Sequence, residues 1–208
     1  MFVELMTDLL SSRFFMEVIL MFYHASQTAG IKTLEPRISN HEKPLVYFSS
    51  KRENTLVYLS NAVEKFCRET GISHDGPYHK WATYGFDCAG LLVLDEYYPN
   101  YIQETYQGVS GYIYHAELIP GKFPMTSIPD GFATDQTVPV DDVEFIPDAY
   151  EALLDAARAG LISLRLYSGH SEKMRAWIHK TVMQEYVEAA KHPEYRAFLD
   201  AKFPFARR

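Results

Sequence analysis

The chain has 208 residues, a formal net charge of −7 and 47% hydrophobic residues, with only 11 glycines and 11 prolines. This balance excludes disordered, collagen-like and low-complexity chains, and the length suits one domain with or without a small appendage. The acidic charge argues against an overall basic surface for binding a nucleic-acid backbone. Two cysteines, Cys67 and Cys88, are too few for a disulfide framework, so the cytoplasm is the expected compartment.

Residues 1–20 form an apolar N-terminal extension. Glu4, Asp8, Arg13 and Glu17 interrupt it and no basic segment precedes it, so we expect neither a signal peptide nor a membrane span. An amphipathic helix packed on the domain or on a partner is the favoured interpretation. The alternative is that the natural start is Met21, where the first strand pattern begins.

From Met21 onward, strand and helix patterns alternate without repeats or a long flexible linker, which predicts one compact α+β unit. Residues 21–26 and 45–50 are short runs rich in aromatic residues, and they predict two strands separated by a loop of turn residues. A helix is then expected over residues 51–69. Its apolar residues recur at helical spacing: Leu56, Leu59, Val63, Phe66 and Cys67. Its candidate caps are Ser49, Ser50 and Asn54.

The second half of the chain predicts further strands and then a helical end. Strand patterns occupy residues 91–98, 111–118 and 137–146, and the middle one alternates with period two. Residues 147–208 are expected to form a helical C-terminal appendage. Its helix signals are Asp148 as a cap, Gly160 as a stop and Ser171 as a second cap.

Familiar motifs for nucleotide, zinc and serine-hydrolase chemistry are missing from the sequence. It contains no GxxxxGK[ST] phosphate loop, no GxGxxG after a strand, no HExxH, no CxxC and no GxSxG. The closest histidines, His74 and His79, share a loop with Asp75, and a solvated loop is favoured there over a metal site. No metal is therefore expected.

Three stretches of the chain carry a family resemblance. FYHAS at 22–26 is followed by VYFSSKRENTLVYLS at 46–60, in which Tyr47 and Tyr58 are eleven positions apart, and GYIYHAEL occupies 111–118. These residues resemble the ADP-ribosyltransferase superfamily, in the branch of the poly(ADP-ribose) polymerases and the rifampin ADP-ribosyltransferases. The resemblance covers about 40 residues in the order the family has them, and it implies a split β-sheet core with flanking helices.

The resemblance also implies roles for individual residues. Tyr47 and Tyr58 would stack on the nicotinamide of NAD and make cation–π contacts with its pyridinium ring. His24 would hydrogen-bond the adenosine-side ribose, the backbone of Ala25 would meet the carboxamide, and Thr55 stands where a family serine adds a hydroxyl. The NAD-contacting set implied in this way is His24, Ala25, Ser26, Tyr47, Ser49, Thr55 and Tyr58, and the catalytic set is His24, Tyr58, Asp135 and Gln136.

The chain departs from the family pattern at two places. Ala25 stands where the family has glycine after the histidine, which adds a methyl group where the ligand approaches the backbone. The acid of the third family motif has no unambiguous counterpart. Gln136 and Asp135 are the first choices, because a strand pattern follows them, and Asp130 and Glu117 are the alternatives.

The expected function is therefore that of a mono-ADP-ribosyltransferase on an ADP-ribosyltransferase-like domain at residues 21–146. Such an enzyme would transfer ADP-ribose from NAD to an unknown acceptor, which is a protein, a nucleic acid or a small molecule, and would release nicotinamide. The alternative is a non-catalytic module that uses the same groove to bind NAD, ADP-ribose or a protein partner. No membrane partner is expected, and the oligomeric state is left open.

Overall fold

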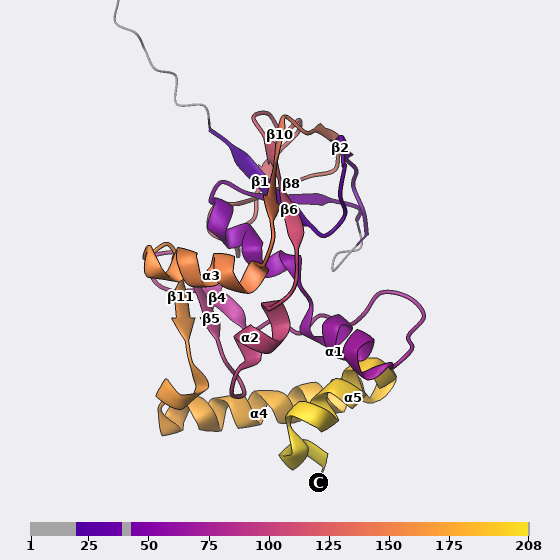
Figure 1. Cartoon of the computed structure of the whole chain (residues 1–208), viewed down its shortest axis with the longest axis vertical. Helices are drawn as coiled ribbons and strands as arrows, with labels where there is room; N and C mark the ends of the chain where they lie inside the picture. The colour runs from indigo at the N-terminus through magenta and orange to yellow at the C-terminus, as the bar shows by residue number, and fades with distance from the viewer. Residues whose placement is uncertain (1–19, 39–42, 208) are drawn as a thin grey trace, which may run out of the picture.

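The computed structural model describes residues 20–38 and 43–207, so the helix expected within residues 1–20 falls outside the described residues apart from Leu20. In these described ranges, no helix has both the length and the apolar character needed to cross a bilayer. A large antiparallel sheet forms one half of the molecule, and most of the helices surround a smaller sheet in the other half (Figure 1). The expected α+β class is confirmed.

The larger sheet has six antiparallel strands in the order β10-β6-β1-β3-β8-β7. Its strands are β1 (Phe22–Ser26), β3 (Val46–Ser49), β6 (Gly111–Ala116), β7 (Phe123–Pro124), β8 (Gly131–Thr134) and β10 (Asp142–Ile146). The strands that carry the three motif stretches, β1, β3 and β6, lie side by side at its centre. The strands predicted at 21–26, 45–50 and 111–118 are confirmed.

Two smaller sheets accompany the large one. The first has the order β11-β5-β4 and the second is a β2-β9 pair. Their strands are β2 (Thr33–Leu34), β4 (Tyr84–Phe86), β5 (Leu92–Asp95), β9 (Val138–Pro139) and β11 (Ser163–Arg165). Because β11 pairs in parallel with β5, a strand lies within the C-terminal segment for which only helices were expected.

Two of the longer helices, α3 and α4, begin at recognisable capping residues. The helices are η1 (Arg52–Leu59), α1 (Ala62–Thr70), α2 (Tyr101–Tyr106), α3 (Ala149–Arg158), α4 (Glu172–Glu188) and α5 (Pro193–Lys202), with short 3₁₀ turns η2 (Tyr167–Gly169), η3 (Ala189–Lys191) and η4 (Pro204–Arg207). Asp148 accepts from the Tyr150 and Glu151 N–H groups in the first turn of α3, and Ser171 accepts from the Met174 N–H in the first turn of α4. Gly160 follows α3 with a φ of +72°, which suits glycine. These three predicted signals are confirmed.

The single helix expected over residues 51–69 is wrong, because the segment breaks after Leu59. Ser60 and Asn61 are extended, and the Ser60 hydroxyl donates to the Thr105 carbonyl oxygen at 2.7 Å. The side chain of Asn61 then caps α1 by accepting from the Val63 N–H. Lys51 precedes η1 without a side-chain cap, so the expected caps Ser49, Ser50 and Asn54 do not serve that role.

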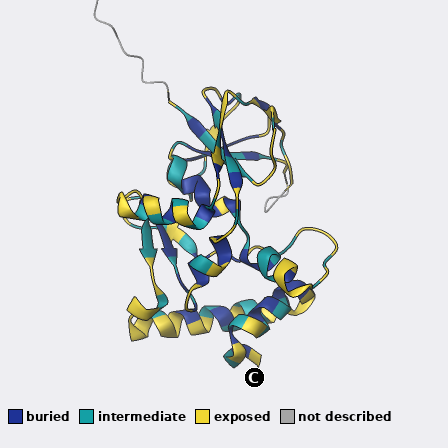
Figure 2. Cartoon of the chain, in the orientation of Figure 1, coloured by how far each residue is buried: buried dark blue, intermediate teal, exposed yellow. Residues whose placement is uncertain are grey.

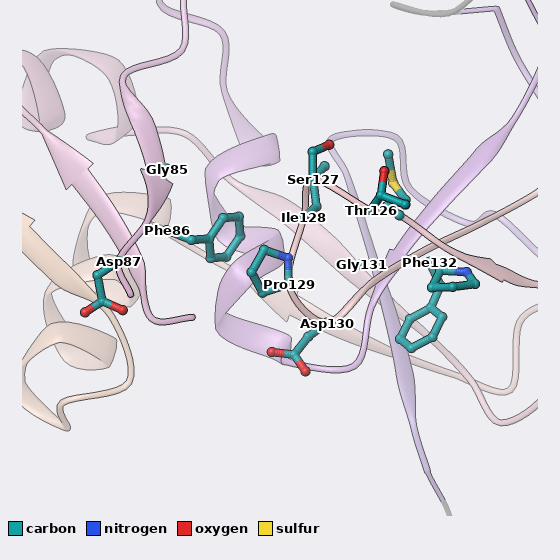
Figure 3. Close-up of a pocket in the computed structure, with 12 residues that line it drawn as sticks. Gly85, Phe86, Asp87, Thr126, Ser127, Ile128, Pro129, Asp130, Gly131 and Phe132 are labelled. Atoms are coloured by element: carbon teal, nitrogen blue, oxygen red, sulfur yellow. The ribbon is translucent and has the colours of Figure 1, made fainter. Parts of the chain in front are cut away.

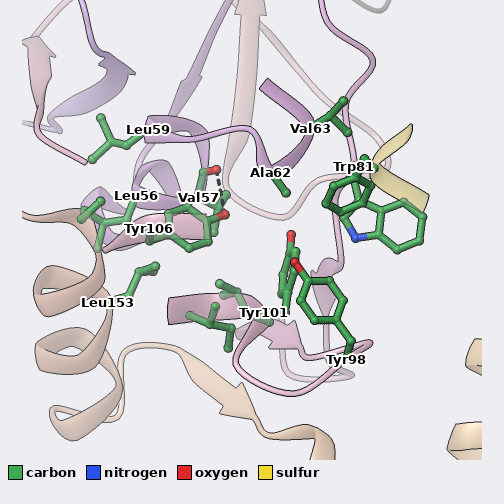
Figure 4. Close-up of a cluster of buried hydrophobic side chains, with 14 of the residues drawn as sticks. Leu56, Val57, Leu59, Ala62, Val63, Trp81, Tyr98, Tyr101, Tyr106 and Leu153 are labelled. Carbon is green, nitrogen blue, oxygen red and sulfur yellow. Dashed lines mark hydrogen bonds between the residues drawn. The ribbon is translucent and has the colours of Figure 1, made fainter. Parts of the chain in front are cut away.

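A large hydrophobic cluster joins η1, α1 and β5 to the C-terminal helices (Figures 2 and 4). Leu56 of η1, Leu153 of α3 and Phe198 of α5 are all fully buried in it. Inside it, the buried Tyr106 hydroxyl donates to the Val57 carbonyl oxygen at 3.1 Å, which satisfies a polar group that would otherwise be costly to bury (Figure 4). Residues 147–207 therefore complete a shared core and do not pack only on themselves.

A second, smaller cluster lies within the large sheet half. Phe22, Val46, Phe48 and Tyr114 form it together with residues of the β2-β9 pair. The Tyr114 hydroxyl donates to the Thr28 carbonyl oxygen at 2.6 Å, which ties the loop after β1 to β6. The large sheet thus has the major cluster and η1 on one face, and this smaller cluster on the other.

Candidate functional site

The strands β1 and β3 pair over a short length and then separate. β1 pairs with β6 along its whole length, from Phe22 opposite Ala116 to Ser26 opposite Tyr112. With β3, β1 forms one registered residue pair, Tyr23 opposite Ser49. The sheet is therefore split beyond Tyr23, between the C-terminal half of β1 and the N-terminal half of β3.

His24 bridges this split. Its Nδ1 atom lies 2.8 Å from the carbonyl oxygen of Tyr47. Because a carbonyl oxygen only accepts, Nδ1 carries the proton, and the neutral ring keeps Nε2 as an acceptor. Burial, as the largest cause, lowers the pKa of His24, and this favours the neutral ring at neutral pH.

The strand register distributes the site residues over both faces of the sheet. Tyr23 and Ser49 are opposite each other, and side chains alternate along a strand, so Ala25 and Tyr47 share their face. His24 belongs to the other face, where its ring is 5.9 Å from that of Phe48. The His24 and Tyr47 rings therefore lie on opposite faces of the sheet. A ligand that contacts both rings must extend from one face to the other between β1 and β3.

Helix η1 lies on the face that carries Ala25 and Tyr47, and it presents Tyr58. Tyr58 is 48% exposed, and its ring stands edge-to-face against Tyr84 of β4 at 5.7 Å. Partial burial, the main cause, raises the pKa of the Tyr58 hydroxyl, so it is a protonated donor at neutral pH. The buried Thr55 hydroxyl donates to the Arg52 carbonyl oxygen at 2.7 Å, which leaves it as an acceptor.

The two predicted serines shape the ends of the strands. The Ser26 hydroxyl oxygen accepts from the Thr28 N–H at 3.1 Å, and that of Ser49 accepts from the Lys51 N–H at 3.0 Å. Both bonds are local turns of the kind that serine forms after a strand. Each hydroxyl keeps its own proton for donation to another group.

The candidate third-motif residues lie on exposed loops. Asp135 and Gln136 follow β8 and are exposed, and the Gln136 side chain packs against Gly121. Asp130 has a φ of +57° and forms an ion pair with Lys51 at 2.8 Å. Glu117 is exposed as well. No described contact joins any of these four to His24 or Tyr58.

A carboxylate that sequence reasoning missed lies on the same face of the sheet as Ala25. Glu144 of β10 is opposite Ile113 of β6, and Ile113 is opposite Ala25. Arg52 donates to both Glu144 oxygens, from Nε at 2.7 Å and from Nη2 at 2.5 Å. These hydrogen bonds, the largest cause, lower the pKa of Glu144. The only sequence signal was its place in an alternating strand.

A cavity of about 600 Å³ lies between β4 and the β7-β8 hairpin (Figure 3). Phe86 of β4 and Pro129 of the hairpin point toward each other across it, and Asp87 and Asp130 lie at its rim. Gly131, which also lines it, is opposite Ser49 of β3. The cavity thus begins where β3 ends and lies on the β4 side, next to Tyr84, the ring partner of Tyr58.

Comparisons of this chain with protein-family models, with curated proteins and with solved structures gave no match.

Proposed function

We propose that this protein binds NAD at the split between β1 and β3 and transfers ADP-ribose to an acceptor. The observation that carries the proposal is the His24–Tyr47 bridge at 2.8 Å, at the point where the two motif strands separate. Further support comes from η1, which follows β3 and packs against β1, and which carries Tyr58 with its ring against Tyr84 of β4.

Transfer of ADP-ribose from NAD requires few functional groups from the protein. The bond between the nicotinamide nitrogen and the ribose C1′ breaks, and its electron pair stays on nitrogen, which neutralises the pyridinium charge. The acceptor oxygen or nitrogen then bonds to C1′ and loses a proton. Tyrosine faces hold the cationic ring through stacking and cation–π attraction, the roles proposed for Tyr47 and Tyr58. Neutral His24 offers Nε2 to a ribose hydroxyl donor, and Ala25 offers its backbone to the carboxamide.

The acceptor is proposed to be a protein side chain or a small molecule in preference to a nucleic acid. The net charge of −7 repels a phosphate backbone at long range. The cavity beside β4 is lined by Asp87, which favours a cationic acceptor, whereas Asp130 at the same cavity is already paired with Lys51.

A second candidate function is a non-catalytic module that binds NAD or ADP-ribose in the same split. The exposed positions of Asp135 and Gln136, with the Gln136 side chain packed on Gly121, favour it. Without an acid at the ribose, transition-state stabilisation is weaker while ground-state binding is kept.

The two functions separate in an assay of nicotinamide release from NAD. Transfer or hydrolysis predicts release by the wild type, and a loss of at least tenfold in Tyr58→Ala and in His24→Asn. Tyr167→Ala, which changes a tyrosine in η2, is the matched control and should retain full activity. Release that Tyr58→Ala leaves unchanged would contradict the proposed site, and an NAD-binding protein that releases nothing would establish the module.

A further inference from the structure

The cavity beside β4 is connected to the proposed NAD site by aromatic side chains. Tyr84 and Phe86 are two positions apart on β4, so their side chains lie on the same face of that strand. The Tyr84 ring stands edge-to-face against Tyr58 at 5.7 Å, and Phe86 lines the cavity. A molecule in the cavity therefore lies close to the tyrosine that we assign to the nicotinamide.

Two apolar side chains face each other across this cavity of about 600 Å³. Phe86 of β4 and Pro129 of the β7-β8 hairpin point toward each other (Figure 3). The turn after β4 approaches the hairpin closely, because a Cβ atom at Gly90 would lie 3.5 Å from the Pro129 Cβ. A flat group fits between a ring and a proline when its faces are apolar and its polar atoms are at its edge.

Asp87, at the end of β4, places a carboxylate beside these two walls. Its Oδ1 accepts from the Ala89 and Leu91 N–H groups, both at 2.9 Å, which fixes the side chain in the turn. Within the described part of the chain, Oδ2 accepts no hydrogen bond and meets no lysine or arginine. The other lining carboxylate, Asp130, is already paired with Lys51 at 2.8 Å. Asp87 is therefore the lining carboxylate that can meet a cation from outside.

We propose that this cavity binds a guanidinium group, so that the acceptor is an arginine side chain or a small guanidine compound. A guanidinium is planar, stacks on aromatic faces and presents N–H donors at its edge to a carboxylate. These properties match Phe86, Pro129 and Asp87. An ammonium group is a compact point charge and gains less from the two apolar walls. The transfer step rests on the proposed function, whereas binding of the guanidinium does not.

The transfer to a guanidinium nitrogen balances without a further reactant. That nitrogen bonds to the ribose C1′ while the bond from C1′ to the nicotinamide nitrogen breaks. The electron pair of the broken bond leaves with nicotinamide, which becomes neutral. The attacking nitrogen loses a proton to water, and the product keeps one positive charge on its guanidinium group. Asp87 and Phe86 contribute by holding the acceptor next to the proposed NAD site.

Calorimetry without NAD tests the binding of the guanidinium group. The probes are agmatine and putrescine, which has an amine in place of the guanidinium. We expect agmatine to bind at least about tenfold more tightly than putrescine. Asp87→Asn keeps an acceptor oxygen for the turn but loses the charge, and it should weaken agmatine binding at least about tenfold. Asp155→Asn, which changes an exposed carboxylate of α3, is the matched control and should bind agmatine as the wild type does.

Mass spectrometry after incubation with NAD tests the acceptor role. The two acceptors are agmatine and a short arginine-containing peptide, and the same peptide with lysine is the control. We expect ADP-ribose on the guanidinium compounds and none on the lysine peptide, with at least about tenfold less product in Asp87→Asn. Modification of agmatine alone indicates a small-molecule acceptor, whereas modification of the peptide as well indicates an arginine side chain.

The outcomes separate this inference from the proposed function. Agmatine binding that is absent, or unchanged in Asp87→Asn, overturns the guanidinium site. Release of nicotinamide without any guanidinium product overturns the acceptor role alone. A wild type that binds agmatine but not NAD contradicts the proposed function and leaves the guanidinium site standing. If circular dichroism shows that Asp87→Asn is unfolded, Phe86→Leu decides, because loss of the ring should remove the preference for agmatine over putrescine.

Discussion

The imidazole of His24 donates through Nδ1 to the carbonyl oxygen of Tyr47 at 2.8 Å, and so joins two strands where their own pairing has ended. A side chain thus replaces the backbone ladder across the split. The bridge fixes the tautomer of His24 and leaves the edges of β1 and β3 apart. The proposal that NAD binds between β1 and β3 rests on this hydrogen bond.

The part-buried bridge predicts that His24 makes stability depend on pH. Because burial lowers the pKa of His24 below the ordinary 6.5, the unfolded chain takes up the proton first. The contribution of His24 to the free energy of unfolding is therefore complete above pH 6.5 and is lost as the pH falls below that value. Urea unfolding between pH 5 and 7.5 should show a shallower pH dependence for His24→Gln than for the wild type. Equal slopes would show that the folded protein does not hold His24 neutral.

The ion pair between Arg52 and Glu144 predicts a measurable coupling between η1 and β10. Both side chains are partly exposed, so solvent screening limits the coupling energy to about 1 kcal/mol. A double-mutant cycle with Arg52→Gln and Glu144→Gln measures it from unfolding free energies. Because the pKa of Glu144 is lowered, this stabilisation is present above pH 4.5 and is lost below it. Additive single-mutant effects would contradict the pairing.

The C-terminal helices are predicted to unfold together with the rest of the molecule. Phe198 of α5 is fully buried in the cluster that also contains Leu56 and Leu153. Phe198→Ala should therefore cost about 3–5 kcal/mol, with one unfolding transition at lower denaturant. Leu153→Ala is the companion variant in α3. A separate early transition in Phe198→Ala alone would show instead that residues 147–208 form an independent appendage.

Two glycines that line the same cavity are predicted to differ in tolerance to alanine. A Cβ atom at Gly131 would lie 2.9 Å from the Ile128 carbonyl oxygen, whereas one at Gly85 would meet nothing within 4 Å. Gly131→Ala should lower the free energy of unfolding by about 1–3 kcal/mol, and Gly85→Ala should change it little. Thermal unfolding of both variants tests this. Equal melting temperatures would mean that the hairpin adjusts without cost.

The parts of the fold that sequence predicted are those with strong local signals. The aromatic strand β1 and the alternating strand β6 follow from periodicity, and the caps Asp148 and Ser171 follow from side-chain chemistry. The break after Leu59 was missed because Leu56, Leu59 and Val63 continue a helical pattern through it. The regular spacing of these three residues reflects their burial in the core. The extended Ser60 is fixed by a hydrogen bond to the distant Thr105.

Other features had no local signal at all. The three residues of β11 become a strand only because β5 pairs with them in parallel, more than 60 positions earlier in the chain. Glu144 looked like one acid among several in its strand, and only the fold brings Arg52 to it. Likewise, His74, in the segment after α1, lies 3.6 Å from Glu194 of α5 because α5 packs against α1. Such contacts arise from tertiary packing, so the periodicity of the sequence does not predict them.

The most direct test of the central claim is an NAD titration by calorimetry on the wild type and on Tyr58→Ala. We expect saturable binding of one NAD per chain to the wild type and a loss of affinity of at least tenfold when the half-exposed ring of Tyr58 is removed. An unchanged affinity in Tyr58→Ala, or no binding by the wild type, would contradict the assignment of the NAD site to the split between β1 and β3.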